Sequence, residues 1–230
     1  MKKIAILCDF DGTVADDDVG NLLFRTYADA EAARAVVDEW KQGLISSREC
    51  LERECALASV NRQELDRFIK ARELDVYFKD FLDFTRRRGM EIVIVSDGLD
   101  YYIERMLLRN GAGDVEFFAN HLRLADHSLR VDFPYHDLMD CKDCGNCKRH
   151  HLEKFKSAGY YVVYIGNGLS DRCPAEHANL VFAKGDLLTF CHRQGIGCVE
   201  FENFRDVERE MLERFVINGS SPSDGSNKTK

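Results

Sequence analysis

Residues 4–13 read IAILCDFDGT, and this stretch decides the fold. Its first five residues are apolar, which is typical of a strand buried on both faces of a parallel sheet. The apolar run stops at Asp9, and Gly12 favours a turn. Because α/β proteins bind ligands beyond the carboxyl ends of their strands, we expect Asp9 and Asp11 to lie at the functional edge of the sheet.

Three similar apolar runs follow, at residues 91–95, 160–165 and 180–183. Helical patterns alternate with these runs, which predicts an α/β fold with a mainly parallel, Rossmann-like sheet. The segments on either side of residues 126–128 favour a β-hairpin.

The long stretch between the first two strands has helical periodicity and no convincing strand. We therefore predict a small helical cap at residues 16–76, inserted into a discontinuous core of residues 1–15 and 77–217. Residues 218–230 have no apolar side chain to bury, so they are predicted to be a disordered tail.

The composition is that of a globular protein, with 45% hydrophobic and 31% charged residues among 230. A formal net charge of −8 argues against nucleic acid or an anionic membrane as a partner. No apolar run approaches the roughly 18 residues of a membrane span, and the N-terminal run is too short for a signal peptide. The nine cysteines are odd in number, which favours reduced thiols and a cytoplasmic location.

Asp9 and Asp11 place two carboxylates where a buried strand ends. Two such like charges need a counter-ion, and oxygen-only ligands suit Mg²⁺. A carboxylate in this position can attack phosphorus and form an aspartyl-phosphate, while the second carboxylate moves a proton. Two solvated aspartates in a surface turn are the alternative interpretation of this pair alone.

Other predicted strand ends carry complementary groups. Ser96, with the following Asp97 and Gly98, offers a hydroxyl and backbone donors for a phosphoryl oxygen. Lys148 stands at the expected start of a helix, where its charge can balance the aspartates and a phosphate. Residues 166–171 add an amide and a carboxylate.

The order of these motifs resembles that of the haloacid dehalogenase superfamily of phosphohydrolases, in the branch that contains phosphoserine phosphatase. The resemblance covers residues 1–215. It implies that Asp9 is the nucleophile, that Asp11 is the general acid and base, and that Ser96 and Lys148 bind the phosphoryl group. The family's metal site implies Mg²⁺ ligands at Asp9, Asp11, Asn167 and Asp171.

Position 167 departs from the family pattern, which has aspartate there. An asparagine oxygen can still coordinate Mg²⁺, but it removes a negative charge, so we expect weaker metal affinity. A different metal preference and lost activity are the alternatives.

Within this branch, the sequence is most similar to the methionine-salvage phosphatases that act on hydroxyketo-methylthiopentenyl phosphate. The similarity rests on residues 144–148, a cysteine-rich loop that runs into the lysine motif. We expect a small phosphorylated metabolite as substrate, with contacts from the first two motifs and the cap. The expected substrate-binding residues are Gly12, Thr13, Asp18, Arg53, Asp97 and Gly98.

The cysteine-rich loop also suggests a structural zinc site with Cys141, Cys144 and Cys147 as ligands and a nearby histidine as the fourth. An iron–sulfur site or a loop of reduced thiols are the alternatives. Of the remaining polar and aromatic residues, His151 is expected on a solvated helix face and Trp40 in the packed interior.

Together these patterns predict a Mg²⁺-dependent phosphomonoesterase. Phosphoserine phosphatase is the first alternative, and a phosphotransferase that uses an alcohol in place of water would share every motif. The alternative of another class is a metal-binding or redox-regulatory protein that keeps the fold.

Overall fold

A computed structural model describes residues 3–140 and 143–217. Within them, seven strands form one sheet in the order β4-β3-β2-β1-β5-β6-β7. The strands are β1 (Ile4–Cys8), β2 (Glu91–Leu99), β3 (Glu116–Ala125), β4 (Ser128–Asp132), β5 (Tyr161–Gly166), β6 (Leu180–Ala183) and β7 (Val199–Glu200). All neighbouring pairs in this sheet are parallel except the hairpin of β3 and β4. The predicted α/β fold with a mainly parallel sheet and a hairpin is confirmed.

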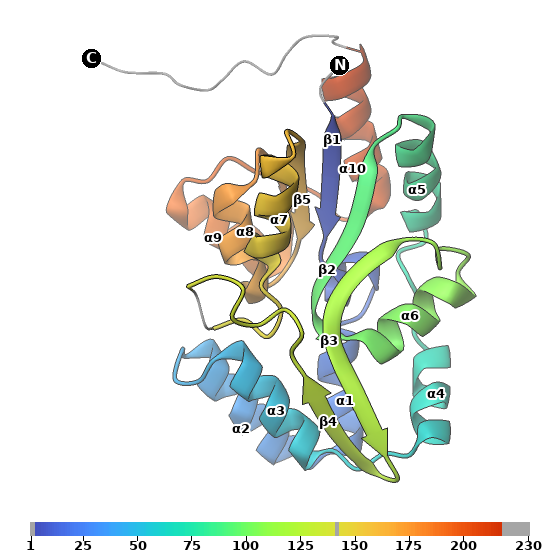
Figure 1. The fold of residues 1–230 in the computed structure, drawn as a ribbon, viewed down its shortest axis with the longest axis vertical. Helices are drawn as coiled ribbons and strands as arrows, with labels where there is room; N and C mark the ends of the chain where they lie inside the picture. Colours follow the sequence, from blue (N-terminus) through green and yellow to red (C-terminus); the bar gives the residue numbers. More distant parts are fainter. Residues whose placement is uncertain (1–2, 141–142, 218–230) are drawn as a thin grey trace.

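Helices cover both faces of this sheet. The α-helices of the described residues are α1 (Val19–Tyr27), α2 (Ala30–Lys41), α3 (Ser47–Leu57), α4 (Arg62–Lys70), α5 (Phe78–Arg87), α6 (Asp100–Arg109), α7 (Lys148–Ser157), α8 (Arg172–His177), α9 (Gly185–Gln194) and α10 (Phe204–Leu212). Figure 1 shows α7, α8 and α9 on one side of the central strands and α5 and α10 on the other.

The central strand β1 is buried on both faces, as its unbroken apolar sequence predicts. Ile6 and Cys8 belong to the large hydrophobic cluster under α5 and α10, whereas Ala5 and Leu7 belong to a second cluster with Leu152 of α7. This alternation follows from the two-residue period of a strand. The end of β1 is therefore fixed from both sides, which positions the residues that follow it.

Strand β2 differs from its predicted end. It continues to Leu99, but its register against β3 shifts between Val95 and Leu99. The shift leaves the intervening segment irregular, and this segment carries Ser96. The short strand β7 was not predicted, because two residues give no pattern to detect.

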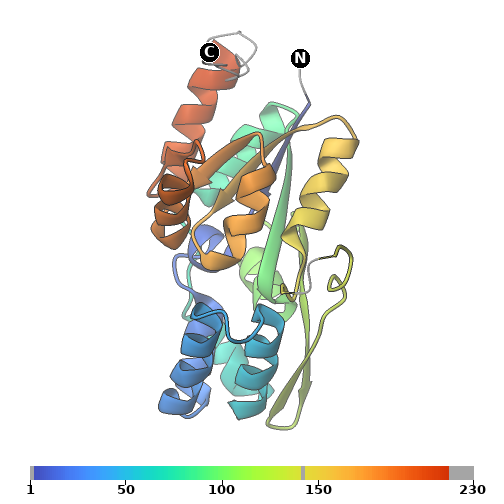
Figure 2. The same ribbon diagram turned by 90° about the vertical axis from the view of Figure 1, so that its left-hand side faces the viewer.

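Helices α1 to α4 lie together beyond the carboxyl ends of the central strands, at the lower end of Figures 1 and 2. The hairpin of β3 and β4 runs down beside α3 in both views. Ser59 pairs with Ser128 in an isolated bridge, and the backbone N–H of Val60 donates to the carbonyl of His127 at 3.1 Å. We interpret residues 16–76 as the predicted cap, braced on one side by the hairpin. The predicted tail, residues 218–230, lies outside the described residues.

Each helix in the described parts of the chain is too short or too polar to cross a membrane.

Candidate active site

Three strand ends bring the predicted motifs to one edge of the sheet. Strand β1 pairs in parallel with β2 on one side and β5 on the other, so their carboxyl ends point the same way. Asp9 follows β1, Ser96 lies near the end of β2, and Asn167 follows β5. All three line one pocket.

The turn after β1 requires its glycine. Gly12 has φ +68°, which is in the left-handed region, and a Cβ there would lie 2.4 Å from Nδ2 of Asn167. A side chain at this position would therefore be strained and would collide with the neighbouring strand end. The turn, residues Phe10–Val14, brings Thr13 close enough for its hydroxyl to donate to Oδ1 of Asn167 at 3.0 Å.

Lys148 is the centre of a buried ion network. It is the first residue of α7, and its Nζ donates to Oδ1 of Asp9 at 2.5 Å and to Oδ1 of Asp171 at 2.6 Å. Ser170 accepts a third hydrogen bond from the same Nζ at 3.1 Å. The side chains of Lys148 and Asp171 are only 1% and 0% exposed, so this network is shielded from water. The ammonium group of Lys148 thus joins Asp9, which follows β1, to Ser170 and Asp171, which follow β5.

Burial controls the charges of this network. Burial raises the pKa of Asp9 well above its usual range, Asp171 raises it further, and Lys148 opposes both effects. For Lys148, burial lowers the pKa, but the two carboxylates outweigh it and the net pKa is raised. The lysine is therefore held as a cation, and it stabilises the ionised form of Asp9.

Three further hydrogen bonds hold the carboxylate of Asp171. The Tyr164 hydroxyl donates to its Oδ1 at 2.6 Å, and the backbone N–H groups of Asn167 and Gly168 donate to its Oδ2 at 3.0 and 2.9 Å. Because both oxygens are occupied, Asp171 holds Lys148 and the turn after β5 in place.

Asp11 lies in the turn after β1 and lines the pocket. Its Oδ2 accepts hydrogen bonds from the Tyr102 hydroxyl at 2.7 Å and from Ser96 at 3.4 Å, and its Oδ1 accepts from the backbone of Gly20 at 3.1 Å. Burial and the nearby carboxylate of Asp18 raise the pKa of Asp11 to about 7. A carboxyl group with this pKa can both give and take a proton near neutral pH.

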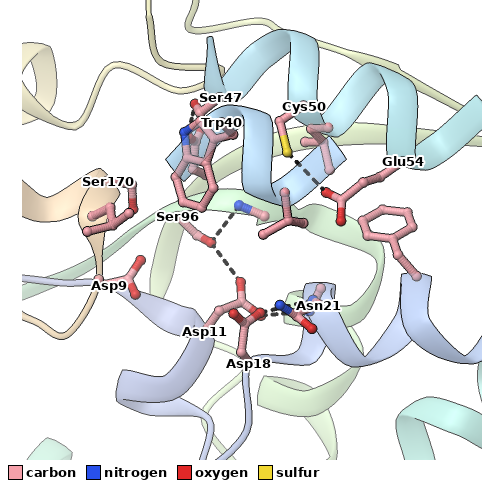
Figure 3. Close-up of a pocket in the computed structure, with 18 of the residues that line it drawn as sticks. Asp9, Asp11, Asp18, Asn21, Trp40, Ser47, Cys50, Glu54, Ser96 and Ser170 are labelled. Carbon is pink, nitrogen blue, oxygen red and sulfur yellow. Dashed lines mark hydrogen bonds between the residues drawn. The ribbon is translucent and has the colours of Figure 1, made fainter. Parts of the chain in front are cut away.

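The site lies at the floor of a cavity of about 430 Å³ between the sheet edge and α1 to α3. Figure 3 shows Asp9, Asp11 and Ser96 on the core side, with Trp40, Cys50 and Glu54 facing them from the cap helices. The apolar part of the wall includes Phe24, Val37, Trp40, Leu51, Leu99 and Leu169.

Glu54 is an acidic group in an unusual environment. It is 8% exposed, and Sγ of Cys50 donates to its Oε2 at 3.7 Å. Burial raises the pKa of Glu54 to about 8. At neutral pH this side chain is mostly a neutral acid, which can donate a hydrogen bond into the pocket.

Of the predicted substrate-binding residues, all but Arg53 lie at the cavity or directly beneath it. Asp18, Asp97 and Gly98 line the cavity, and Gly12 and Thr13 form the turn beneath it. Arg53 lies elsewhere: it pairs with Glu39 at 2.8 Å and with Glu49, and it is absent from the described wall of the cavity. Its position argues against the expected substrate contact, because the neighbouring Glu54 occupies the inward face of α3.

Trp40, expected as a packing residue, is half-buried and lines the cavity. The expectation for His151 was wrong. His151 is buried, at 2% exposure, and its ring stacks on Phe118 at a centroid distance of 4.3 Å. Tyr102, which holds Asp11, was missed because nothing local in the sequence distinguishes it from a packing residue.

The structural zinc site is not supported. Among the described residues, no group of three or more His, Cys, Asp or Glu side chains is arranged to hold a metal ion. Cys144 and Cys147 belong to the described part of the loop, whereas Cys141 lies outside it.

Comparison with known proteins agrees with this arrangement. The family model for haloacid dehalogenase-like hydrolases matches residues 6–176. A 2-hydroxy-3-keto-5-methylthiopentenyl-1-phosphate phosphatase from an Exiguobacterium species is 31% identical over 209 residues, covering 90% of this chain and 96% of that protein. The enzyme of the same name from Geobacillus kaustophilus is 29% identical, with coverage of 94% and 98%.

Among solved structures, a phosphoserine phosphatase captured as an analogue of its phospho-aspartyl intermediate has a TM-score of 0.71. The two sequences are 21% identical, and the alignment covers 91% of this chain and 99% of that one. This likeness supports the fold, and the family model covers more than half of the chain. The chain therefore belongs to the haloacid dehalogenase-like hydrolase family and is a phosphatase.

Proposed function

We propose that this phosphatase is a Mg²⁺-dependent phosphomonoesterase that works through an aspartyl-phosphate on Asp9. The observation that carries the proposal is the Asp9–Lys148–Asp171 network, in which Asp9 lines the floor of the pocket and Lys148 and Asp171 are buried behind it. One oxygen of Asp9 is held by Lys148, and this fixes the direction of the carboxylate. A nucleophile that is already oriented avoids the entropic cost of finding its attack geometry.

The reaction proceeds in two steps, transfer of the phosphoryl group to Asp9 and its hydrolysis. The Asp9 carboxylate forms a bond to phosphorus while the ester P–O bond breaks, and Asp11 gives its proton to the leaving alcohol oxygen. Water then attacks phosphorus, the P–O bond to Asp9 breaks, and Asp11 takes a proton from the water, which releases inorganic phosphate. Ser96 would donate to a phosphoryl oxygen, and Lys148, held behind Asp9, would supply positive charge close to the phosphoryl group. The charge on the phosphoryl oxygens is the main object of stabilisation in phosphoryl transfer.

The chemistry of the donor set supports a magnesium ion. Asp9 and Asp11 are two carboxylates whose pKa is raised by burial, and among the described residues Lys148 is the one cation that forms an ion pair with Asp9. The residues that would hold Mg²⁺ are Asp9, the backbone carbonyl of Asp11 and Asn167, all oxygen donors. Asp171, whose two oxygens already accept hydrogen bonds, would support this site by holding Lys148 and the turn after β5. When bound, Mg²⁺ supplies positive charge that polarises the phosphoryl group.

We infer that the substrate is a small phosphate ester with an uncharged, largely apolar leaving group. The wall of the cavity is apolar at Phe24, Trp40 and Leu51, and the buried acid Glu54 offers a neutral donor. A hydroxyketo-methylthiopentenyl phosphate, the substrate named for the Exiguobacterium relative, has these properties. Arg53, an expected substrate-binding residue, pairs with Glu39 and Glu49 and does not line the cavity, so it offers no contact to the carboxylate of phosphoserine.

Phosphate release over a panel of phosphate esters, with Mg²⁺ and with EDTA, tests the reaction and the substrate together. We expect Mg²⁺-dependent turnover, greater with the methylthiopentenyl ester than with phosphoserine. Asp9→Asn should abolish turnover of every ester, whereas Asp83→Asn, the same change at an exposed ion pair on α5, should not alter it. Retained activity in Asp9→Asn refutes the mechanism, and preference for phosphoserine refutes the substrate assignment.

A further inference from the structure

Asp97 lies next to the phosphate-binding Ser96, yet both of its carboxylate oxygens are occupied by the protein. The Ser47 hydroxyl donates to Oδ2 at 2.5 Å, and the backbone N–H of Asn146 donates to Oδ1 at 2.7 Å. Nδ2 of Asn120 donates to the Asp97 carbonyl at 2.7 Å. Three segments that are distant in sequence therefore meet at one residue in the irregular part of β2.

Asn146 extends this junction toward the catalytic lysine, which follows two residues later. It is fully buried, and its Nδ2 donates to the carbonyls of Ser96 and Phe118, each at 2.8 Å. Because that amide nitrogen donates twice, its Oδ1 is the acceptor for Nε2 of His151 at 2.8 Å. The residue thus ties the end of β2 to the start of α7.

Ser47 brings the cap to the same junction. It is the first residue of α3, and its backbone N–H donates to the carbonyl of Asp143 at 2.9 Å. Its Oγ also accepts from the backbone N–H of Gly145 at 3.3 Å. A Cβ at Gly145 would lie 2.8 Å from Oδ1 of Asp97, so the close approach of the loop requires a glycine here.

We propose that Asp97 is a positioning residue: by holding Ser47 of the cap and Asn146 of the loop, it fixes the cap and Lys148 relative to the phosphate-binding Ser96. The proposal rests on the catalytic roles proposed above for Ser96 and Lys148. It gives the cysteine-rich loop a function that needs no metal, since residues 143–147 link the cap to the core. It also assigns Asp97 a role through other residues, in place of the substrate contact expected from the sequence.

Two adjacent serines make a matched pair for the test. Ser46 and Ser47 both stand at the start of α3, but Ser46 caps the helix by accepting from the backbone N–H of Glu49, and Ser47 binds Asp97. Ser46→Ala removes a helix cap and Ser47→Ala removes the junction. A hydrogen bond to a carboxylate is strong enough for at least a tenfold effect.

Turnover of p-nitrophenyl phosphate by wild type and variants gives the first readout. We expect Ser47→Ala to lower kcat about tenfold or more, Ser47→Thr to retain activity because it keeps the hydroxyl, and Ser46→Ala to leave kcat unchanged. In an Asp97→Ala background, Ser47→Ala should cause a much smaller loss than in the wild type, because their shared hydrogen bond is already gone and only the contacts of Ser47 with residues 143 and 145 remain to be lost. Equal losses in Ser46→Ala and Ser47→Ala, or fully additive losses in the double variant, overturn the proposal. So does an Asp97→Ala variant that raises KM alone, as a direct substrate contact would.

Amide hydrogen exchange gives a second readout that does not depend on activity. Ser47→Ala should speed exchange at residues 143–147, and Ser46→Ala should not. If the wild type releases no phosphate, the proposed function fails, but the exchange data still test whether the contacts of Asp97 with Ser47 and Asn146 hold the loop. Unchanged exchange in Ser47→Ala would show that Asp97 does not hold the loop.

Discussion

Glu54 should make the protein lose stability as the pH rises. Its folded-state pKa is raised by burial from an ordinary 4.5 to about 8. The unfolded chain therefore releases this proton at a lower pH than the folded protein does. The stabilising contribution is complete below pH 4.5, declines between pH 4.5 and pH 8, and is fully lost above that range.

The size of the effect follows from the shift. Each pKa unit corresponds to about 1.4 kcal/mol, so ionising Glu54 in the folded protein costs about 5 kcal/mol at the high-pH limit. Glu54→Gln keeps the shape and removes the titration. We expect this variant to be close to wild type in stability near pH 4.5 and several kcal/mol more stable, relative to wild type, near pH 8.

Urea unfolding of both proteins at intervals between pH 4.5 and pH 8.5, in EDTA, measures the difference. Glu52→Gln is the control, because Glu52 is on the same helix with a side chain that is 45% exposed and paired with Arg48. Its stability difference from wild type should stay nearly constant with pH. A Glu54→Gln difference that is independent of pH, or that favours wild type as the pH rises, refutes the buried neutral acid.

Three further predictions concern the core of the site. Lys148→Met should leave two buried carboxylates without their cation, which lowers the unfolding free energy by about 3–5 kcal/mol and abolishes phosphate release. Urea unfolding and a phosphate assay measure the two effects, and a variant as stable as the wild type would contradict the prediction. Asn167→Asp should restore a negative ligand and lower the Mg²⁺ concentration for half-maximal activity, and an unchanged Mg²⁺ titration would argue against Asn167 as a ligand. Gly12→Ala should abolish activity, because its Cβ would lie 2.4 Å from Nδ2 of Asn167. Gly43→Ala is the control: Gly43 has a similar φ but no neighbour within 4 Å, so this variant should affect stability alone. Equal activity in the two variants would contradict this reasoning.

The sheet and the motif residues could be predicted because their signals are local. An unbroken apolar run ending in a carboxylate identifies β1 and Asp9, and the parallel arrangement then requires the strand ends to converge. The ion network of Lys148 with Asp9 and Asp171 follows from that convergence.

The cap pocket could not be predicted in the same way, because it depends on how helices are rotated. One residue along a helix turns the side chain by about 100°, so the choice between Arg53 and Glu54 as the inward residue depends on packing between helices. The same limit applies to Trp40, which has the spacing of a packing residue and lines the cavity. His151 was misplaced because its neighbours are polar, although the ring is buried under Phe118.

The hairpin of β3 and β4 affects how this enzyme could be re-engineered. One hydrophobic cluster includes Ile6 of the central strand, Leu51 and Leu65 of the cap helices, and Leu129 of the hairpin. A graft that exchanged residues 16–76 for another cap would open that shared interior and remove both α3, which packs beside β4, and the Ser59 bridge to the hairpin. Altered substrate choice is therefore better sought through single replacements at the inward face of α3 than through exchange of the whole cap.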